Sequence, residues 1–94
     1  MRVEWLPAAE WSFRSIIEFV KKDNPHAARG LAERVMTAVE SLADNPMRGR
    51  SGRVSGTREL VIAGTPYIVP YSVNGSTIIV IRVLHGAQRW PNEF

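Results

Sequence analysis

The side chains of this 94-residue chain that are best suited to chemistry lie in its second half. His85 is the only histidine there, and Tyr67, Tyr71 and Glu59 are the other groups that could donate or accept a proton. Six arginines accompany them, and no lysine follows Lys22. Arginine presents a planar fork of donors that matches phosphate and carboxylate. The set could therefore move protons and hold an anion.

The basic residues are distributed unevenly. Residues 1–44 have a net charge of −1 and residues 45–94 a net charge of +4. Four of the arginines, Arg48, Arg50, Arg53 and Arg58, form a cluster within eleven positions. A single surface arginine usually serves solubility, but a cluster predicts an anionic partner, either nucleic acid or an acidic protein segment.

Several classes of site are not expected. The chain has no cysteine, so it contains neither a disulfide framework nor a cysteine metal site. His26 and His85 are far apart, with no carboxylate at a ligand-like spacing, so we predict no metal and no cofactor. The glycines of residues 49–56 lack the preceding strand and following helix of a phosphate loop. We find no signal peptide and no apolar run near the roughly 20 residues of a membrane span, and we expect a cytoplasmic protein.

The elements that must position these residues follow from periodicity. Residues 2–5 alternate and predict a strand, and apolar residues from Ala9 to Val20 at helical spacing predict a helix from Pro7 to about Lys22. Asn24-Pro25 begins a second helix that extends to about Ala43. A glycine- and arginine-rich loop covers residues 46–57. Strands are predicted over residues 58–63, 67–73 and 77–84, with a turn at residues 64–66 and a hairpin at Asn74-Gly75.

These elements define an α+β protein of order β-α-α-β-β-β, a single domain over residues 1–94. The helix hairpin must cover one face of a mostly antiparallel, four-stranded sheet, since neither layer buries its apolar side alone. The apolar last strand belongs at a central position covered on both faces. Pro70 falls inside a predicted strand, so we expect a bulge or an unpaired N–H side at that residue.

Alternation along the strands sorts the candidate residues. Arg58 and Glu59 are adjacent and point to opposite faces, so they cannot form one catalytic pair. Glu59 is best explained as a structural partner of Arg82 or Arg50. Tyr67 and Tyr71 share a face and are expected to pack under the helices with their hydroxyls at the margin.

The aromatic residues suggest contacts with partners. Trp11 lies off the apolar stripe of the first helix and either contacts a protein or covers the edge of the core. Trp90 follows the last strand and is expected to fold back on the chain. A purely structural role for His85 is the other interpretation, in which a neutral ring is hydrogen-bonded to nearby backbone.

Four segments make the chain resemble the RelE/ParE toxins of bacterial type II toxin–antitoxin modules, also called plasmid stabilisation proteins. They are PAAE at residues 7–10, NPMRGR at 45–50, GTRE at 56–59, and the Y-x-x-x-Y of residues 67–71 leading to RVLH at 82–85. The strings GTPYIVPY and HGAQRWP look especially like the ParE side of the family. The resemblance covers nearly the whole chain and implies the same β-α-α-β-β-β fold.

The family implies two activities and one partner. RelE-like members are ribosome-dependent endoribonucleases that cut mRNA (mRNA interferases), and ParE-like members inhibit DNA gyrase. Both are neutralised by an antitoxin whose disordered segment wraps the toxin, so a heterotetramer or larger complex is possible.

The residues that this chain shares with the family, and those that it lacks, bear on which of the two activities to expect. His85 lies where related ribonuclease toxins often carry a catalytic histidine, and in that case His85, Arg58 and Arg82 form the catalytic set, with Arg89 also holding phosphate. However, the strand at residues 67–73 carries no arginine and the RelE-type lysines are missing. We therefore favour a ParE-like toxin, and a module that has lost toxicity is a third alternative. The expected antitoxin- or target-binding residues are Arg48, Arg50, Arg53, Arg58, Arg89, Trp90 and Trp11.

Overall fold

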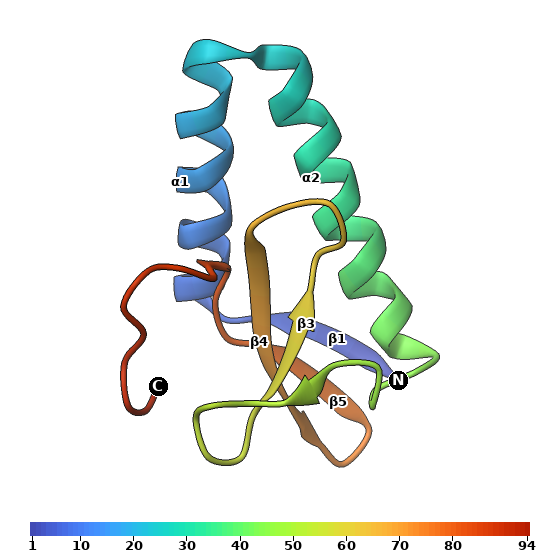
Figure 1. Cartoon of the computed structure of the whole chain (residues 1–94). Coiled ribbons are helices and arrows are strands. Elements are labelled where there is room, and N and C mark those ends of the chain that lie inside the picture. Colours follow the sequence, from blue (N-terminus) through green and yellow to red (C-terminus); the bar gives the residue numbers. More distant parts are fainter.

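A computed structural model describes residues 1–94 and places a helix hairpin against one face of a sheet (Figure 1). The predicted α+β architecture is confirmed, with one strand, then two helices, then the remaining strands. The elements are β1 (Arg2–Trp5), α1 (Pro7–Asp23), α2 (Pro25–Glu40), a 3-10 turn (Ser41–Ala43), β2 (Arg50–Ser51), β3 (Arg58–Val61), β4 (Tyr67–Asn74), β5 (Thr77–Val80) and β6 (Leu84–His85).

The two helices are delimited by residues that the sequence places at their ends. Pro7 occupies the first turn of α1, and Lys21 and Lys22 lie in its last turn, where the helix dipole favours cations. Asn24 caps α2, because its side-chain oxygen accepts a hydrogen bond of 3.0 Å from the amide of Ala27. The hairpin extends beyond the turn between β3 and β4 (Figure 1).

The sheet is mostly antiparallel and its strand order is β1-β5-β4-β3-β2, with β6 also paired to β4. Only β1 and β5 run parallel. The prediction of four strands was too low, since the sheet has six. The additional strand β2 lies inside the predicted loop of residues 46–57, and the predicted strand over residues 77–84 is divided into β5 and β6.

The division of the last strand has its cause at Pro70. Tyr71 pairs with Val80, but Ile68 pairs with Leu84. The three residues 81–83 therefore lie opposite the two residues 69–70, and the register of the pairing shifts by one. The carbonyl of Pro70 accepts a hydrogen bond from the amide of Ile81, while proline has no N–H to return. An irregularity of pairing is therefore present beside Pro70 as expected, but the extra residue of the bulge lies in the opposite strand and not at Pro70 itself.

The bulge frees a backbone amide that the helix hairpin then satisfies. The N–H of Val83 leaves the sheet ladder and donates to the hydroxyl of Ser12 on α1, at 2.9 Å. The Ser12 hydroxyl itself donates to the carbonyl of Ala9. This contact ties the irregular part of the last strand to α1.

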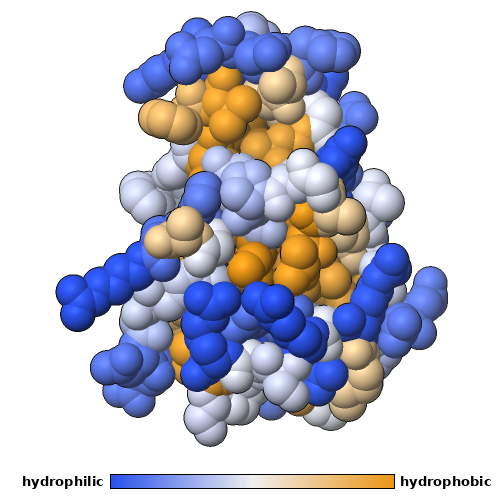
Figure 2. Space-filling model, viewed as in Figure 1, coloured by the Kyte–Doolittle hydropathy of each residue, from blue (hydrophilic) through white to orange (hydrophobic).

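The core lies between the helices and the sheet. Its twelve buried residues are Ala9, Leu31, Val35, Val39, Leu42, Leu60, Ile62, Val69, Tyr71, Ile78, Val80 and Val83. Tyr67 and Val73 pack against them, so the predicted inward face of β4 is confirmed. The opposite face of the sheet is partly covered, with Val54, Ile68 and Leu84 buried. Figure 2 shows a hydrophobic area over the sheet on this face, with strongly hydrophilic side chains directly below it.

Neither helix combines the length and apolar character that a membrane span requires.

Candidate partner-binding site

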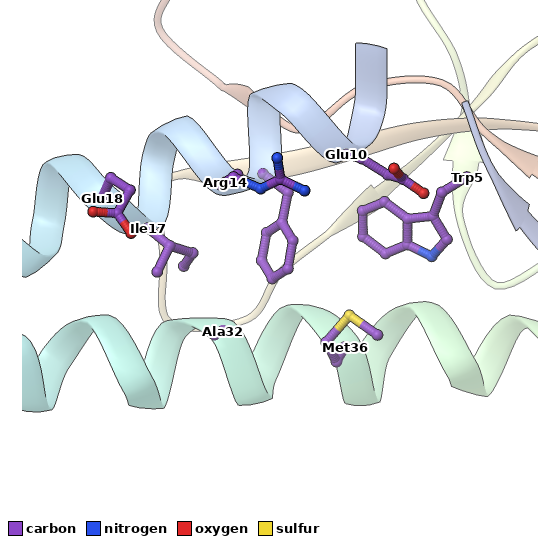
Figure 3. A pocket seen from close by; sticks show the side chains of 8 residues that line it. Trp5, Glu10, Arg14, Ile17, Glu18, Ala32 and Met36 are labelled. Carbon is purple, nitrogen blue, oxygen red and sulfur yellow. The ribbon is translucent and has the colours of Figure 1, made fainter. Parts of the chain in front are cut away.

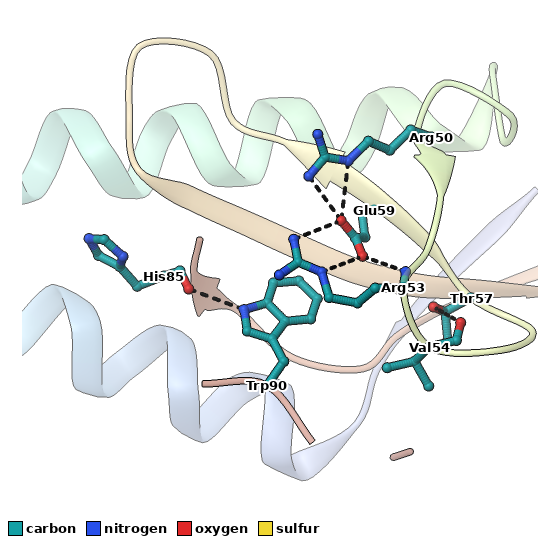
Figure 4. A network of polar contacts seen from close by, with 7 residues as sticks. All are labelled: Arg50, Arg53, Val54, Thr57, Glu59, His85 and Trp90. Carbon is teal, nitrogen blue, oxygen red and sulfur yellow. Dashed lines mark hydrogen bonds and ion pairs between the residues drawn. The ribbon is translucent and has the colours of Figure 1, made fainter. Parts of the chain in front are cut away.

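Glu59 is the centre of a network of polar contacts with Arg50 and Arg53 (Figure 4). It lies on the face of β3 that points away from the helices, because its neighbour Leu60 faces the core. Only 2% of the residue is exposed. Its carboxylate accepts two hydrogen bonds from the Arg50 side chain, at 3.2 and 3.0 Å, and three from Arg53, including one from the Arg53 backbone amide at 2.8 Å. The predicted pairing with Arg50 is confirmed, and Arg53 takes the place that we considered for Arg82.

The surroundings of Glu59 favour its charged form. Burial alone raises the pKa of the Glu59 carboxyl, but the hydrogen bonds from Arg53 and Arg50 and the charge of Arg53 outweigh burial. The pKa of Glu59 therefore lies below its ordinary value of 4.5. Since the two arginine side chains remain 56% and 41% exposed, they present fixed cationic groups to solvent around a buried carboxylate.

Trp90 connects the C-terminal segment to this network. The Arg53 guanidinium lies 3.7 Å from the centroid of the Trp90 ring, which is a cation–π contact. The indole Nε1 donates to the carbonyl of His85 at 3.2 Å (Figure 4). Trp90 thus folds back on the chain, and its contacts join β6 to the loop that follows β2.

The other two arginines of the cluster serve a different part of the fold. Arg58 donates to the carbonyls of Gly49 and Met47, at 2.9 and 3.3 Å. Arg48 donates to the hydroxyl of Ser41 at 3.1 Å. Arg58 and Glu59 point to opposite faces of β3, so the cluster is divided between the two sides of the sheet.

The segments that carry the family resemblance meet at this point. The Tyr71 hydroxyl donates to the carbonyl of Pro46 at 2.7 Å and accepts from the amide of Gly49 at 2.8 Å. Residues 45–50 are therefore held by Tyr71 and Arg58, and β2 is held by the pairing of Arg50 with Glu59. These shared residues support the fold around the arginines.

His85 has a structural partner. Its Nδ1 accepts a hydrogen bond of 3.0 Å from the amide of Ala87, and its own amide donates to the Gln88 side chain at 2.7 Å. The ring packs edge-on against Tyr67, with 5.6 Å between ring centroids. An acceptor at Nδ1 requires that nitrogen to be unprotonated, which leaves Nε2 as the proton-bearing nitrogen. The backbone contact that we considered for His85 is present.

The three residues of the possible catalytic set do not converge. His85 pairs with Tyr67 on one side of β4, and Arg58 pairs with Tyr71 on the other side. Tyr67 and Tyr71 are four positions apart, which is about 13 Å along the strand. The Arg82 guanidinium lies 5.9 Å from the centroid of the Phe94 ring. No hydrogen bond, ion pair or ring contact joins any two of the three.

The predicted binding residues outside the network are on the surface. Trp11 is 70% exposed and lines a groove of about 470 Å³ beside α1, together with Arg82 and Gln88. Arg89 is exposed. Sequence reasoning missed Phe19, which is 68% exposed, because it lies just beside the apolar stripe of α1.

A second groove that sequence reasoning did not find lies between the two helices (Figure 3). It has a volume of about 430 Å³, and its apolar lining includes Trp5 and Met36, with Glu10, Arg14 and Glu18 along α1. Trp5 packs on Phe13 with 5.4 Å between ring centroids. No three metal-ligating side chains gather anywhere in the structure.

Comparisons with known proteins agree with this fold. Residues 3–90 match the family model of the ParE toxin of the type II toxin–antitoxin system parDE. The chain is 40% identical over 90 residues to the putative toxin Y4kP of Sinorhizobium fredii, covering 96% of this chain and 93% of that protein. It is 33% identical over 87 residues to toxin RelE2 of Caulobacter vibrioides, covering 93% and 97% of the two chains.

Solved structures show the same architecture. The chromosomal ParDE toxin–antitoxin system of P. aeruginosa contains a chain that superimposes with a TM-score of 0.83 at 23% identity, covering 90% of this chain and 95% of that one. A YoeB/ParE toxin from Agrobacterium tumefaciens gives 0.60 at 18% identity, over 90% and 98% of the two chains. Fold and matches together define a toxin of a type II toxin–antitoxin system. The chain belongs to the RelE/ParE family, through its ParE toxin model, and this family implies a cognate antitoxin partner.

Proposed function

We propose that this chain is a ParE-like toxin of the cytoplasm that inhibits growth by binding DNA gyrase and is neutralised by its cognate antitoxin. The observation that carries the proposal is that the candidate catalytic side chains His85 and Arg58 are hydrogen-bonded to backbone groups of the chain. His85 Nδ1 accepts a backbone amide, and Arg58 donates to two backbone carbonyls. Cleavage of a phosphodiester needs a proton-transferring group and free cations preorganised around one phosphate, and these residues have other partners.

A supercoiling assay tests the gyrase target. Purified toxin should block ATP-dependent supercoiling of relaxed plasmid by gyrase, and added antitoxin should restore it. Trp11→Ala should weaken the block, because an exposed tryptophan commonly supplies much of a protein contact. Met47→Ala, which also removes an exposed apolar side chain, serves as the matched control and should inhibit like the wild type. Growth arrest with supercoiling unaffected would overturn the gyrase assignment.

A RelE-like mRNA interferase is the second candidate. Two observations favour it: the similarity to toxin RelE2, and the free Nε2 of His85 beside Tyr67. In that case the toxin cuts mRNA on ribosomes, and His85→Ala abolishes cutting while the protein stays folded. Ribosome-dependent cleavage by the wild type, lost in His85→Ala, would establish this alternative over gyrase inhibition. Harmless expression without antitoxin would reject both toxic activities and support a module that has lost toxicity.

The antitoxin should cover the outer face of the sheet, where Glu59 holds Arg50 and Arg53 in place and where Trp90 contacts Arg53. The exposed Arg89 precedes Trp90 in the chain. Neutralising Arg50 and Arg89 together to Ala should weaken the complex and flatten the dependence of its dissociation constant on salt, since fewer ion pairs are screened. Changing Arg29 and Arg14, exposed arginines of the helices, to Ala is the control with equal loss of charge. Equal effects of the two double variants would count against this face. Light scattering of the complex then tests for the expected heterotetramer or larger assembly.

A further inference from the structure

The outer side of α1 carries two exposed aromatic residues in one line. Trp11, Ser15 and Phe19 are spaced four residues apart, so they lie on one side of the helix, and Lys22 extends the same line. Trp11 is 70% exposed and Phe19 is 68% exposed. The small Ser15 leaves a gap between the two rings, whose positions are about 12 Å apart along the helix axis. The line is therefore an apolar surface with a gap in its middle, which a side chain of another helix can enter.

A groove adjoins this line, between α1 and the part of the chain that follows β5. It has a volume of about 470 Å³, and its apolar lining includes Ile16, Val83 and Leu84. Trp11 and Ser15 line it as well, so the line along α1 and the groove form one continuous surface. Figure 1 shows the C-terminal segment passing beside the first part of α1.

The charges on this surface are positive. Arg82 is the only charged residue that lines the groove, and no carboxylate lies there. The Arg82 guanidinium lies 5.9 Å from the centroid of the Phe94 ring and makes neither a hydrogen bond nor an ion pair within the chain. Lys22, at the end of the line, is exposed and also makes no ion pair. An unpaired guanidinium beside an apolar groove is suited to a carboxylate.

From these features we propose that the line of Trp11, Ser15 and Phe19, with the groove beside it, binds an acidic amphipathic helix of the toxin's target protein. Aliphatic side chains of that helix cover the two aromatic rings and enter the gap at Ser15, and one of its carboxylates pairs with Arg82. A second copy of this chain fits less well, because the groove lining supplies no carboxylate for the Arg82 of a partner copy. That the target is gyrase rests on the proposed function.

Two substitutions test the gap and the charge separately. Ser15→Gln fills the gap at an exposed helix position, and Arg82→Gln removes the cation. Each should raise the dissociation constant of the toxin for gyrase about tenfold or more, because each acts at the centre of the contact. Thr37→Gln and Arg29→Gln make corresponding changes at exposed positions of α2 and are the matched controls. The controls should leave the dissociation constant within about twofold.

Binding of gyrase that is equal for a variant and its control, in either pair, would overturn the proposal. A second result would also overturn it: if Ser15→Gln and Arg82→Gln weaken the complex with the antitoxin and leave binding to gyrase unchanged, this surface belongs to the antitoxin. Circular dichroism of the four variants shows whether each is folded before its binding is compared.

The three tryptophans report on three different surfaces of the wild-type protein, so a second test needs no variant. Trp11 lies on the proposed surface, Trp5 lines the groove between the helices, and Trp90 contacts Arg53. An acetylated and amidated peptide of two repeats of Glu-Ala-Leu-Glu-Glu-Leu-Leu should shift the indole N–H resonance of Trp11 and leave those of Trp5 and Trp90 in place. The same peptide with lysine in place of each glutamate should shift none of them at the same concentration.

The acidic peptide separates failure of this proposal from failure of the proposed function. If the peptide shifts the Trp11 resonance but gyrase does not bind the toxin, the surface stands and the gyrase assignment of its occupant falls. If the peptide leaves the Trp11 resonance in place, or shifts that of Trp5 or Trp90 as strongly, the surface is rejected whatever gyrase does. Equal shifts from the lysine peptide would reject an acidic partner.

Discussion

At Glu59, five hydrogen bonds from two arginines offset the loss of hydration that burial imposes on a carboxylate. The arginines stay partly in water, so each is still hydrated on its outer side. The network therefore fixes the direction of two cationic groups with one buried anion. Its net charge is +1, which suits an acidic partner.

Glu59→Gln should destabilise the protein by about 1–3 kcal/mol at pH 7, because it removes the charge and one acceptor from a buried, charge-assisted network. The lowered pKa of Glu59 gives this loss a pH dependence. The contribution is fully present above the unfolded pKa of about 4.5 and is lost as pH falls through the lower folded pKa. Denaturant unfolding at several pH values should show the wild type and Glu59→Gln converging in acid.

The control is Glu93→Gln, which changes an exposed carboxylate near the C-terminus. This variant should unfold like the wild type at neutral pH. A gap between wild type and Glu59→Gln that stays constant down to pH 2 would contradict the account of the pKa.

Tyr71→Phe removes a buried hydroxyl that bridges Pro46 and Gly49. The amide and carbonyl left without partners should lower the free energy of unfolding by about 1–3 kcal/mol. Tyr67→Phe is the matched control, since the Tyr67 hydroxyl makes no hydrogen bond within the chain, and we expect a change under about 0.5 kcal/mol. Chemical denaturation measures both, and equal losses would show that the bridge contributes nothing.

At the scale of elements, two glycine positions differ in whether they leave room for a side chain. A Cβ at Gly49 would lie 2.6 Å from Tyr71 Cε1 and 2.8 Å from the carbonyl oxygen of Glu59, so β2 can approach β3 only because residue 49 has no side chain. Gly30 lies in α2 with nothing within 4 Å of the corresponding position. The first glycine is a packing requirement and the second only lowers helix stability.

Gly49→Ala should therefore destabilise the protein by about 1–3 kcal/mol through overpacking. Gly30→Ala should stabilise it by about 0.5–1 kcal/mol, since alanine favours the helix. Thermal unfolding of the two variants gives the comparison. A Gly30→Ala variant less stable than the wild type would mean that this face of α2 needs the glycine for another purpose.

The long elements were predictable because their signals are local. Helical spacing, Asn24-Pro25 and Asn74-Gly75 placed both helices and the β4–β5 hairpin, and Pro70 predicted the bulge. The strand β2 was not predictable, since two residues in a glycine-rich loop pair with β3 only through the contact of Arg50 with Glu59. The gap between β5 and β6 lies opposite Pro70 of β4. The apolar pattern of residues 77–84 alone cannot predict it, because the cause lies on another strand.

The candidate site was predictable in part for the same reason. Alternation placed Glu59 on the face of its strand opposite to Arg58, and either Arg82 or Arg50 was expected as its partner. The contacts of Arg53 with Glu59 and Trp90 depend on the path of a loop and of the C-terminal segment, and no local pattern encodes them. The fold-back of Trp90 was expected from its position, but its partner was not.

At the scale of the whole molecule, Trp90 joins the end of the chain to the loop after β2. Trp90→Ala should lower the free energy of unfolding by about 0.5–2 kcal/mol, through the lost cation–π contact and hydrogen bond. Amide exchange over residues 86–94 should accelerate, because few other contacts hold this segment. Trp11→Ala removes a tryptophan that is 70% exposed and should leave both quantities unchanged. An unaltered exchange pattern in Trp90→Ala would show that the segment is held elsewhere.

The parallel pairing of β1 with β5 determines when the toxin can complete its fold during synthesis. Arg2 lies beside Thr77 and Trp5 lies beside Val80. β1, the first strand to leave the ribosome, therefore cannot pair until β5, near the end of the chain, has also been synthesised. Contacts this distant along a chain form slowly and late. We therefore expect a ribosome-bound nascent chain to remain unfolded and harmless until synthesis ends, which leaves an interval in which an antitoxin already present can meet the toxin as it folds.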